Sequence, residues 1–174
     1  IALLIKLDSP GPVLYRHERI GRGGRSMRIW KFRTMVNKAD ELLEDLISSD
    51  AGLHEEWDAN HKLKQDPRVT RIGRLLRRTS VDELPQIINI LKGEMSYVGP
   101  RPIVQDEVKL YEGGFELYKK VRPGLSGLWQ VSGRSDTSYA YRVSLDEYYI
   151  RHWTIWLALY ILIKTAWVVL SRRS

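Results

Sequence analysis

Hydrophobic and polar positions along the chain predict several helices and one β-hairpin. From Val13 to Thr34, apolar residues are interspersed with basic ones, and the sequence GRGG at 21–24 interrupts them as a turn. We therefore expect a hairpin over about residues 13–34. Residues 37–48 instead repeat apolar positions at helical spacing, opposite acidic ones, which predicts an amphipathic helix.

Three further segments carry helical patterns. Arginines recur three apart between residues 68 and 77, so a helix would gather them roughly on one side. The segment from Asp82 to Lys92 is apolar at helical spacing and ends before Gly93, a residue typical of helix C-termini. Residues 139–151 are also expected to be helical.

The two ends of the chain are strongly apolar. We interpret Ile1–Ile5 as the tail of a hydrophobic segment that continues upstream in the full protein. Residues 153–170 are apolar at all but three positions and contain tryptophans, which favour the membrane–water interface. A helix in that interface fits the segment as well as a helix that spans the bilayer, and a buried core helix is the alternative.

Composition and charge narrow the classes of function. The chain has 174 residues, of which 43% are hydrophobic and 28% charged, so we expect one folded domain over residues 1–174. The absence of cysteine excludes disulfides and thiolate metal sites. The net charge of +7 indicates an anionic partner: nucleic acid, phospholipid headgroups or a phosphorylated substrate. Solvated basic and acidic faces are the alternative explanation.

Two adjacent carboxylates, Asp82 and Glu83, stand in the sequence RRTSVDELPQ. In a structural interpretation, Asp82 caps a helix whose first turn contains Pro85, and Ser80 and Glu83 have the spacing of a capping box. In a chemical interpretation, nearby arginines keep both carboxylates ionised and bind phosphate. One carboxylate could then attack phosphorus while its neighbour binds Mg²⁺. The residues alone leave both interpretations open.

Four blocks of sequence carry a resemblance over almost the whole chain. In order, they are SPGPVLYRHERIGRGGRSMRIWKFRTM, DPRVTRIGRLLRRTSVDELPQIINILKGEMSYVGPRPI, VRPGLSGLWQVSGR and LDEYYIRHWTIW. They resemble the bacterial sugar transferase family of monotopic phosphoglycosyl transferases, most of all the catalytic domain of undecaprenyl-phosphate galactose or glucose phosphotransferases. The resemblance implies transfer of a sugar-1-phosphate from a UDP-sugar to undecaprenyl phosphate, with release of UMP. That reaction primes exopolysaccharide, capsule or O-antigen synthesis.

The resemblance also implies a fold and roles for individual residues. Asp82 would be the nucleophile that forms a phosphosugar–aspartate intermediate, and Glu83 would be the catalytic partner that binds Mg²⁺. The substrate-binding positions would be Lys31, Arg77, Arg101, Arg134 and Asp146. The implied fold is a compact, helix-rich α+β domain with a small β-hairpin and membrane-interface helices, one of them at residues 153–170.

The implied partners are a UDP-sugar, undecaprenyl phosphate and membrane lipid, but no nucleic acid, while homo-oligomerisation stays open. The implied location is the cytoplasmic face of the bacterial inner membrane. Two other classes compete with this prediction. A basic nucleic-acid-binding module would explain the arginines but leaves VDELP and the tryptophan-rich tail without a role. A membrane-bound scaffold without catalysis is the third class.

Overall fold

The structure is a computed structural model that describes residues 1–60, 63, 65–132 and 138–171. Its α-helices and 3₁₀-helices confirm a helix-rich α+β class with a small antiparallel hairpin. The first half of the chain contains α1 (Ala2–Asp8), β1 (Leu14–Ile20), η1 (Arg22–Gly24), β2 (Ser26–Phe32), α2 (Ala39–Ser49), α3 (Ala51–Asn60), α4 (Arg71–Arg78), η2 (Val81–Gln86) and α5 (Ile87–Leu91). The second half contains β3 (Ser96–Val98), η3 (Gln105–Gly114), α6 (Phe115–Tyr118), β4 (Gly124–Ser126), α7 (Leu128–Val131), α8 (Tyr139–Arg151) and α9 (Ile155–Leu170).

The chain divides into two compact units. The first unit contains residues 1–15 and 32–82, and the second contains residues 16–31 and 83–174. The chain passes from the first unit to the second between Asp82 and Glu83, so the two adjacent carboxylates belong to different units.

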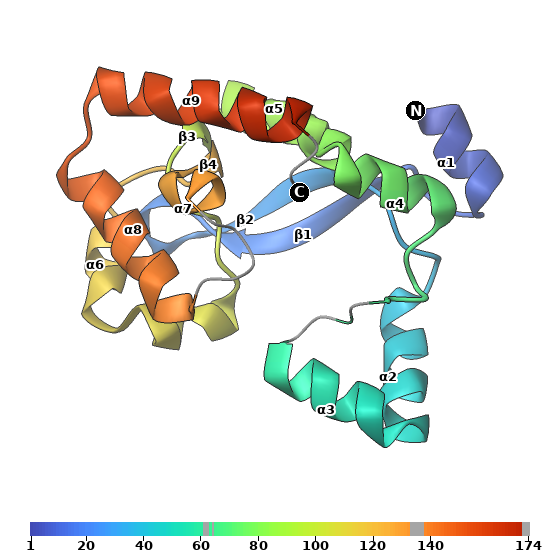
Figure 1. Ribbon diagram of the computed structural model, residues 1–174. Coiled ribbons are helices and arrows are strands. Elements are labelled where there is room, and N and C mark those ends of the chain that lie inside the picture. The colour runs from blue at the N-terminus through green and yellow to red at the C-terminus, as the bar shows by residue number, and fades with distance from the viewer. Residues whose placement is uncertain (61–62, 64, 133–137, 172–174) are drawn as a thin grey trace. The chain divides into compact units, whose positions relative to one another are not determined.

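The predicted hairpin is confirmed as strands β1 and β2, which form a two-stranded sheet (Figure 1). Its turn depends on glycine, because Gly23 and Gly24 have φ angles of 75° and 74°. Residues other than glycine adopt this left-handed backbone conformation only at a cost in free energy. The Gly21 N–H donates to the Arg25 carbonyl at 2.8 Å and closes the turn.

In the first unit, α4 confirms the arginine-rich helix predicted between residues 68 and 78, although its α-helical part begins only at Arg71. The Thr70 hydroxyl accepts the Gly73 N–H at 2.9 Å and caps the helix. A Cβ at Gly73 would lie 2.0 Å from the Thr34 carbonyl oxygen, so this close approach requires glycine. The amphipathic helix predicted at 37–48 is also confirmed, as α2.

The continuous helix predicted from Asp82 to Lys92 is wrong in its first half. Residues Val81–Gln86 form the 3₁₀-helix η2, and only Ile87–Leu91 are α-helical. Pro85, which has no N–H to donate, lies inside η2, and the apolar spacing alone did not distinguish a 3₁₀-helix from an α-helix here. Asp82 therefore does not lie at the N-terminus of an α-helix, and the capping interpretation is wrong in that form.

In the second unit, two short strands were not predicted. β3 and β4 pair in parallel, with Ser96 opposite Gly124 and Val98 opposite Ser126. Helix α9 packs on both strands and on α7 (Figure 1). Two clusters of buried side chains form the core; they are Ile20, Ile103, Tyr111, Tyr118 and Val143 in one, and Val98, Leu128, Tyr149 and Ile161 in the other.

The two C-terminal helices match the predicted segments closely. Helix α8 has the predicted bounds, whereas α9 begins at Ile155 after a cap in which the Thr154 hydroxyl accepts the Leu157 N–H at 3.1 Å. Of the helices in the described ranges, none combines the length and the apolar character that crossing a bilayer requires.

Candidate active site

Glu83 and Lys31 form an ion pair in the second unit. The Lys31 Nζ, near the end of β2, lies 2.7 Å from the Glu83 Oε1 in η2. The Lys31 and Glu83 side chains are 26% and 37% exposed, so a dissolved phosphate or metal ion can reach them. Because ion pairs in contact with water contribute little to stability, this pair is better suited to binding than to holding the fold.

Asn89 holds α5 against β2 and so positions this ion pair. It is fully buried at 0% exposure. Its Nδ2 donates to the Arg28 carbonyl at 2.8 Å and to the Glu94 Oε2 at 2.6 Å, and its Oδ1 accepts the Trp30 N–H at 3.1 Å. Sequence analysis missed Asn89. Its only signal is one polar residue within the apolar run IINIL.

The apolar positions that predicted a helix from Asp82 to Lys92 lie largely outward. Exposed fractions are 47% for Leu84, 39% for Ile87, 39% for Ile88 and 80% for Leu91. An apolar surface therefore follows Glu83 directly along the chain, within the same unit.

Asp82 is only 9% exposed and lies near Arg77, within the first unit. Burial lowers the pKa of the Arg77 guanidinium, while the charges of Asp82 and Asp66 raise this pKa and favour the cation. The Arg77 Nε donates to the Thr34 hydroxyl at 2.9 Å, which fixes the guanidinium. The structure thus brings together two predicted site residues, a carboxylate and a cation.

Arg101 and Asp146 are the third pair of predicted residues that come together. The Arg101 N–H donates to the Asp146 Oδ2 at 3.4 Å, and the Tyr111 hydroxyl donates to the same oxygen at 2.7 Å. The Arg101 guanidinium lies 3.6 Å from the Glu107 Oε1, and its Cζ lies 5.8 Å from the centre of the Trp129 ring.

Asp146 is 2% exposed, whereas the Arg101 side chain is 33% exposed. Burial raises the pKa of the Asp146 carboxyl to about 7, although the Tyr111 hydrogen bond and the Arg101 charge lower it. A ligand can therefore reach Arg101 but not Asp146. Sequence analysis missed Tyr111, which lies in none of the four blocks, and gave no role to Trp129, which lies in the block VRPGLSGLWQVSGR.

Arg134, the remaining predicted residue, lies outside the residues that the structure describes. The other predicted residues form three local pairs: Lys31 with Glu83, Arg77 with Asp82, and Arg101 with Asp146. The roles of these residues in binding substrate stay predictions, and because Asp146 is buried we do not expect it to contact substrate directly.

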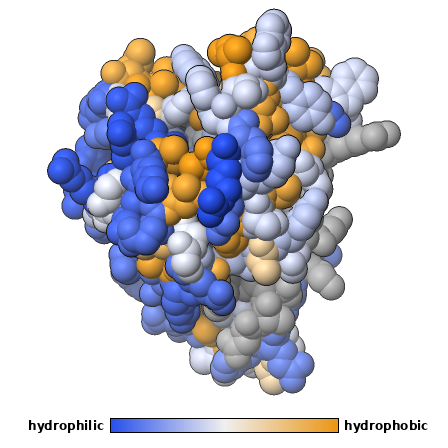
Figure 2. All heavy atoms as spheres, turned by 90° about the vertical axis from the view of Figure 1, so that its left-hand side faces the viewer, coloured by the Kyte–Doolittle hydropathy of each residue, from blue (hydrophilic) through white to orange (hydrophobic). Residues whose placement is uncertain are grey.

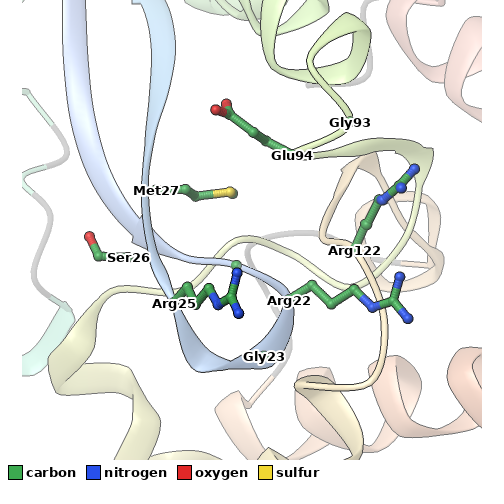
Figure 3. Close-up of a pocket in the computed structure, with 9 residues that line it drawn as sticks. Arg22, Gly23, Arg25, Ser26, Met27, Gly93, Glu94 and Arg122 are labelled. Atoms are coloured by element: carbon green, nitrogen blue, oxygen red, sulfur yellow. The ribbon is translucent and has the colours of Figure 1, made fainter.

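A cavity of about 580 Å³ lies elsewhere in the second unit, beside the hairpin turn (Figure 3). Arg22, Arg25, Arg122 and Glu94 are its charged lining residues, so its charged side chains are mainly basic. It contains none of the predicted site residues and, Glu94 apart, no carboxylate. We therefore place the candidate active site not at this cavity but at the first turn of η2, which contains both adjacent carboxylates and is called the Asp82–Glu83 turn below.

The donor chemistry at the turn fits Mg²⁺. Magnesium is commonly held by one or two carboxylates together with substrate phosphates, not by a cage of protein ligands. Glu83 supplies such a carboxylate and is partly exposed. Within residues 1–60, 63, 65–132 and 138–171, no cluster of three or more potential ligand side chains is found.

Known proteins resemble the chain over nearly all of its length. The family described as Bacterial sugar transferase matches residues 1–172. The exopolysaccharide production protein ExoY of Rhizobium meliloti (strain 1021) is 50% identical over 175 residues, covering 100% of this chain and 77% of the relative. The undecaprenyl-phosphate galactose phosphotransferase of Salmonella typhimurium is 50% identical over 162 residues, covering 93% of this chain and 34% of the relative.

A third relative is the UDP-glucose:undecaprenyl-phosphate glucose-1-phosphate transferase of Escherichia coli (strain K12). It is 40% identical over 174 residues, which cover 95% of this chain and 34% of the relative. The chain therefore spans about three quarters of ExoY but only about a third of the other two proteins. The prediction of a sugar transferase is confirmed at the level of the family: the chain belongs to the bacterial sugar transferases.

Proposed function

We propose that the protein transfers a hexose-1-phosphate from a UDP-sugar to undecaprenyl phosphate and releases UMP, as the priming step of exopolysaccharide, capsule or O-antigen synthesis. The observation that carries the proposal is that each adjacent carboxylate has its own basic neighbour: Asp82 has Arg77, and Glu83 has Lys31. Cations beside a nucleophile and a metal-binding carboxylate are suited to a diphosphate substrate. The names of the Salmonella and Escherichia coli relatives support the two substrates.

In the proposed reaction, a carboxylate oxygen of Asp82 attacks the phosphorus that carries the sugar. The bond between this phosphorus and the bridging oxygen of the diphosphate breaks, and UMP leaves with the electron pair. A phosphate oxygen of undecaprenyl phosphate then attacks the same phosphorus and releases the Asp82 carboxylate. Covalent catalysis of this kind divides one difficult displacement into two easier ones.

Glu83 is the residue that would hold Mg²⁺, and a bound ion would neutralise charge that develops on the diphosphate. The Glu83 carboxylate would exchange part of its interaction with Lys31 for the ion. The Lys31 ammonium, which lies 2.7 Å from Glu83, would bind a substrate phosphate oxygen.

We also propose that the protein works at the cytoplasmic face of the inner membrane, in contact with lipid. Apolar side chains reach the surface near the upper edge of the face drawn in Figure 2. Along α9 and just before it, the large apolar side chains that are more than half exposed are Trp153, Ile155, Trp156, Ile163, Trp167 and Leu170. Exposed apolar surface of this extent marks an interaction site, and tryptophans favour the headgroup region.

Release of UMP tests the proposed reaction. Purified protein would be incubated with Mg²⁺, undecaprenyl phosphate and a panel of UDP-hexoses, and UMP would be measured over time. We expect continuous release with at least one UDP-hexose, and release limited to about one UMP per enzyme when the lipid acceptor is left out. Absence of release with every sugar would overturn the proposal. Salt-sensitive binding to a DNA duplex would then favour the nucleic-acid-binding class.

Flotation with liposomes tests the proposed location. The protein should float with vesicles that contain anionic lipid, and less protein should float as salt concentration rises. If the protein floats but releases no UMP, the scaffold class is favoured. If it does not float with any vesicle, the proposed membrane contact is wrong.

A further inference from the structure

The loop at residues 99–103 has a gap in its backbone hydrogen bonds that one side chain fills. The carbonyl groups of residues 100 and 103 each accept a backbone N–H at 2.8 Å, which ties both ends of the loop. Pro100 and Pro102 have no N–H, so Arg101 supplies the one backbone donor between them. That N–H is directed to the Asp146 carboxylate, at 3.4 Å. The Asp146 carboxylate therefore accepts the hydrogen bond of the backbone N–H in the middle of the loop.

Asp146 is itself fixed from the opposite side. The Tyr111 hydroxyl donates to the same Oδ2 at 2.7 Å, and both residues are buried, at 4% exposure for Tyr111 and 2% for Asp146. The side chain of Arg101 leaves this buried cluster and stays 33% exposed. Its guanidinium is held between Glu107, at 3.6 Å, and the Trp129 ring, at 5.8 Å. The part of the cluster that a ligand can touch is therefore the guanidinium.

We propose that Asp146 is a positioning residue for Arg101: its buried carboxylate, braced by Tyr111, fixes the loop so that the Arg101 guanidinium is presented to the phosphates of the nucleotide sugar. The identity of this ligand rests on the proposed function, whereas the coupling of Asp146 to Arg101 is a property of the resting protein. Asp146 thus acts through Arg101 and does not contact substrate. Tyr111 gains a role in the reaction that no sequence pattern indicates.

The charge on Asp146 controls how strongly it holds the loop, because hydrogen bonds to an ionised acceptor are stronger than those to a neutral one. Its pKa of about 7, raised by burial, places the change of charge near neutral pH. The Oδ1 is buried without a hydrogen-bond partner among the described residues, so the proton of the neutral form can lie there while Oδ2 keeps both donors. The loop is therefore held more weakly as pH falls through about 7.

Other ionisable groups surround this cluster. They are Arg101 on the loop, Glu107 and Tyr111 on η3, Tyr118 on α6, and Tyr139 and Arg142 on α8. Burial raises the pKa of all three tyrosines above the ordinary value, so their hydroxyls stay neutral near pH 7.

The backbone amide resonance of Arg101 tests the coupling without any substrate. Its ¹⁵N chemical shift would be followed by NMR in the whole protein, between about pH 5 and pH 9. We expect a titration with an apparent pKa of about 7 in the native protein, and none in Asp146→Asn. In the native protein the hydrogen bond from Tyr111 lowers the Asp146 pKa. Tyr111→Phe removes this bond, so the titration should move to higher pH. Tyr149→Phe is the matched control, since this buried tyrosine on α8 donates to the Val98 carbonyl at 3.3 Å.

Steady-state kinetics of UMP release at the same pH values test the consequence for substrate. Asp146→Asn should lower kcat/KM about 10- to 100-fold, mainly by raising KM for the UDP-sugar, and should remove the acidic limb of the pH profile. Tyr111→Phe should move that limb to higher pH. A role in folding alone would reduce the amount of active enzyme and leave the pH profile in place.

Each result decides one question. If the Arg101 amide does not titrate near pH 7, or still does so in Asp146→Asn, the coupling is wrong, whatever the protein transfers. If the amide titrates but Asp146→Asn keeps the native KM and pH profile, the positioning role is wrong. If the native protein releases no UMP, the proposed function fails, and the NMR result still decides the coupling. If Asp146→Asn does not fold, Tyr111→Phe decides both questions.

Discussion

Glu83 and Asp146 are two acids of the same unit with opposite surroundings. Glu83, in η2, forms an ion pair with the Lys31 ammonium of β2, and the Glu83 side chain is 37% exposed. Asp146 is 2% exposed, and its Oδ2 receives hydrogen bonds from two neutral donors, a hydroxyl and a backbone N–H. The first carboxylate can exchange its partner for an ion or a substrate, whereas the second can act only through the groups that it holds.

This difference shows that an acid in the candidate site gains its role from its surroundings and not from its residue type. Burial raises the pKa of Asp146 to about 7, so its charge changes with pH near neutrality. The Asp82–Glu83 turn places its carboxylates beside the cations of Arg77 and Lys31, which are suited to bind phosphate.

The largest effect is expected from Asp82→Asn, which tests whether the Asp82 carboxylate is the nucleophile of the reaction. The amide keeps the shape of the side chain but is a poor nucleophile at phosphorus, so turnover should fall by about 10⁴-fold or more while the protein stays folded. UMP release and circular dichroism would measure the two outcomes. Native-like turnover in this variant would move the chemistry away from Asp82.

Asp66→Asn is the matched control for Asp82→Asn, since both acids lie in the field of Arg77. Asp66 binds the Arg68 guanidinium at 2.7 and 2.8 Å, so its loss should lower the free energy of unfolding. It should leave the turnover of each folded molecule nearly unchanged. Equal losses of turnover in both variants would indicate that charge, and not nucleophilic attack, is what matters at Asp82.

The second effect in size is expected from Glu83→Gln. This change removes the charge that would bind Mg²⁺ and pair with Lys31, so turnover should fall by about 10²- to 10³-fold and should need more Mg²⁺. Native protein should stop turning over in excess EDTA. The control is Glu41→Gln, which removes an exposed partner 3.0 Å from Lys38 and should not change turnover. Full turnover of native protein in EDTA would contradict the magnesium assignment.

The smallest effect is expected in the stability of the folded protein, through the buried acid Asp146. The folded-state pKa of Asp146 is raised from 3.8 to about 7, so ionisation of this buried acid costs stability as pH rises between these values. The native free energy of unfolding should therefore fall as pH rises from about 4 to about 7, by at most roughly 4 kcal/mol for this group, and should not fall further above that range. Asp146→Asn should remove that component in urea titrations. An unchanged slope would show that Asp146 is already ionised at low pH.

Much of the fold could be predicted because its elements carry local signals. The glycine turn at residues 21–24, the stripe of residues 37–48 and the bounds of α8 follow from spacing and turn chemistry. The parallel pair β3–β4 could not be predicted, since each strand has three residues and depends on a partner far along the chain. The α-helix from Asp82 was wrong in its first half, where Val81–Gln86 form a 3₁₀-helix, because apolar spacing over so few residues does not separate the two helix types.

The sequence predicted candidate site residues, but it did not predict the buried residues that hold them in place. Asp82 and Glu83 stand out as adjacent acids among arginines, and the family resemblance supplied Lys31 and Arg101. Asn89 and Tyr111 could not be identified, because their importance arises from buried hydrogen bonds across long sequence separations. Asp146 also differs from Glu83 in its burial, and the local sequence pattern does not predict whether a single acid is buried.

Trapping of the covalent intermediate is the most direct test of the account. Native protein would be incubated with a UDP-hexose and Mg²⁺ without lipid acceptor, digested, and analysed by mass spectrometry. We predict an added hexose-phosphate mass on the peptide that contains Asp82, its loss on addition of undecaprenyl phosphate, and its absence in Asp82→Asn. Asp82 is not the nucleophile if the adduct lies on another residue. The same holds if the protein turns over without ever carrying an adduct.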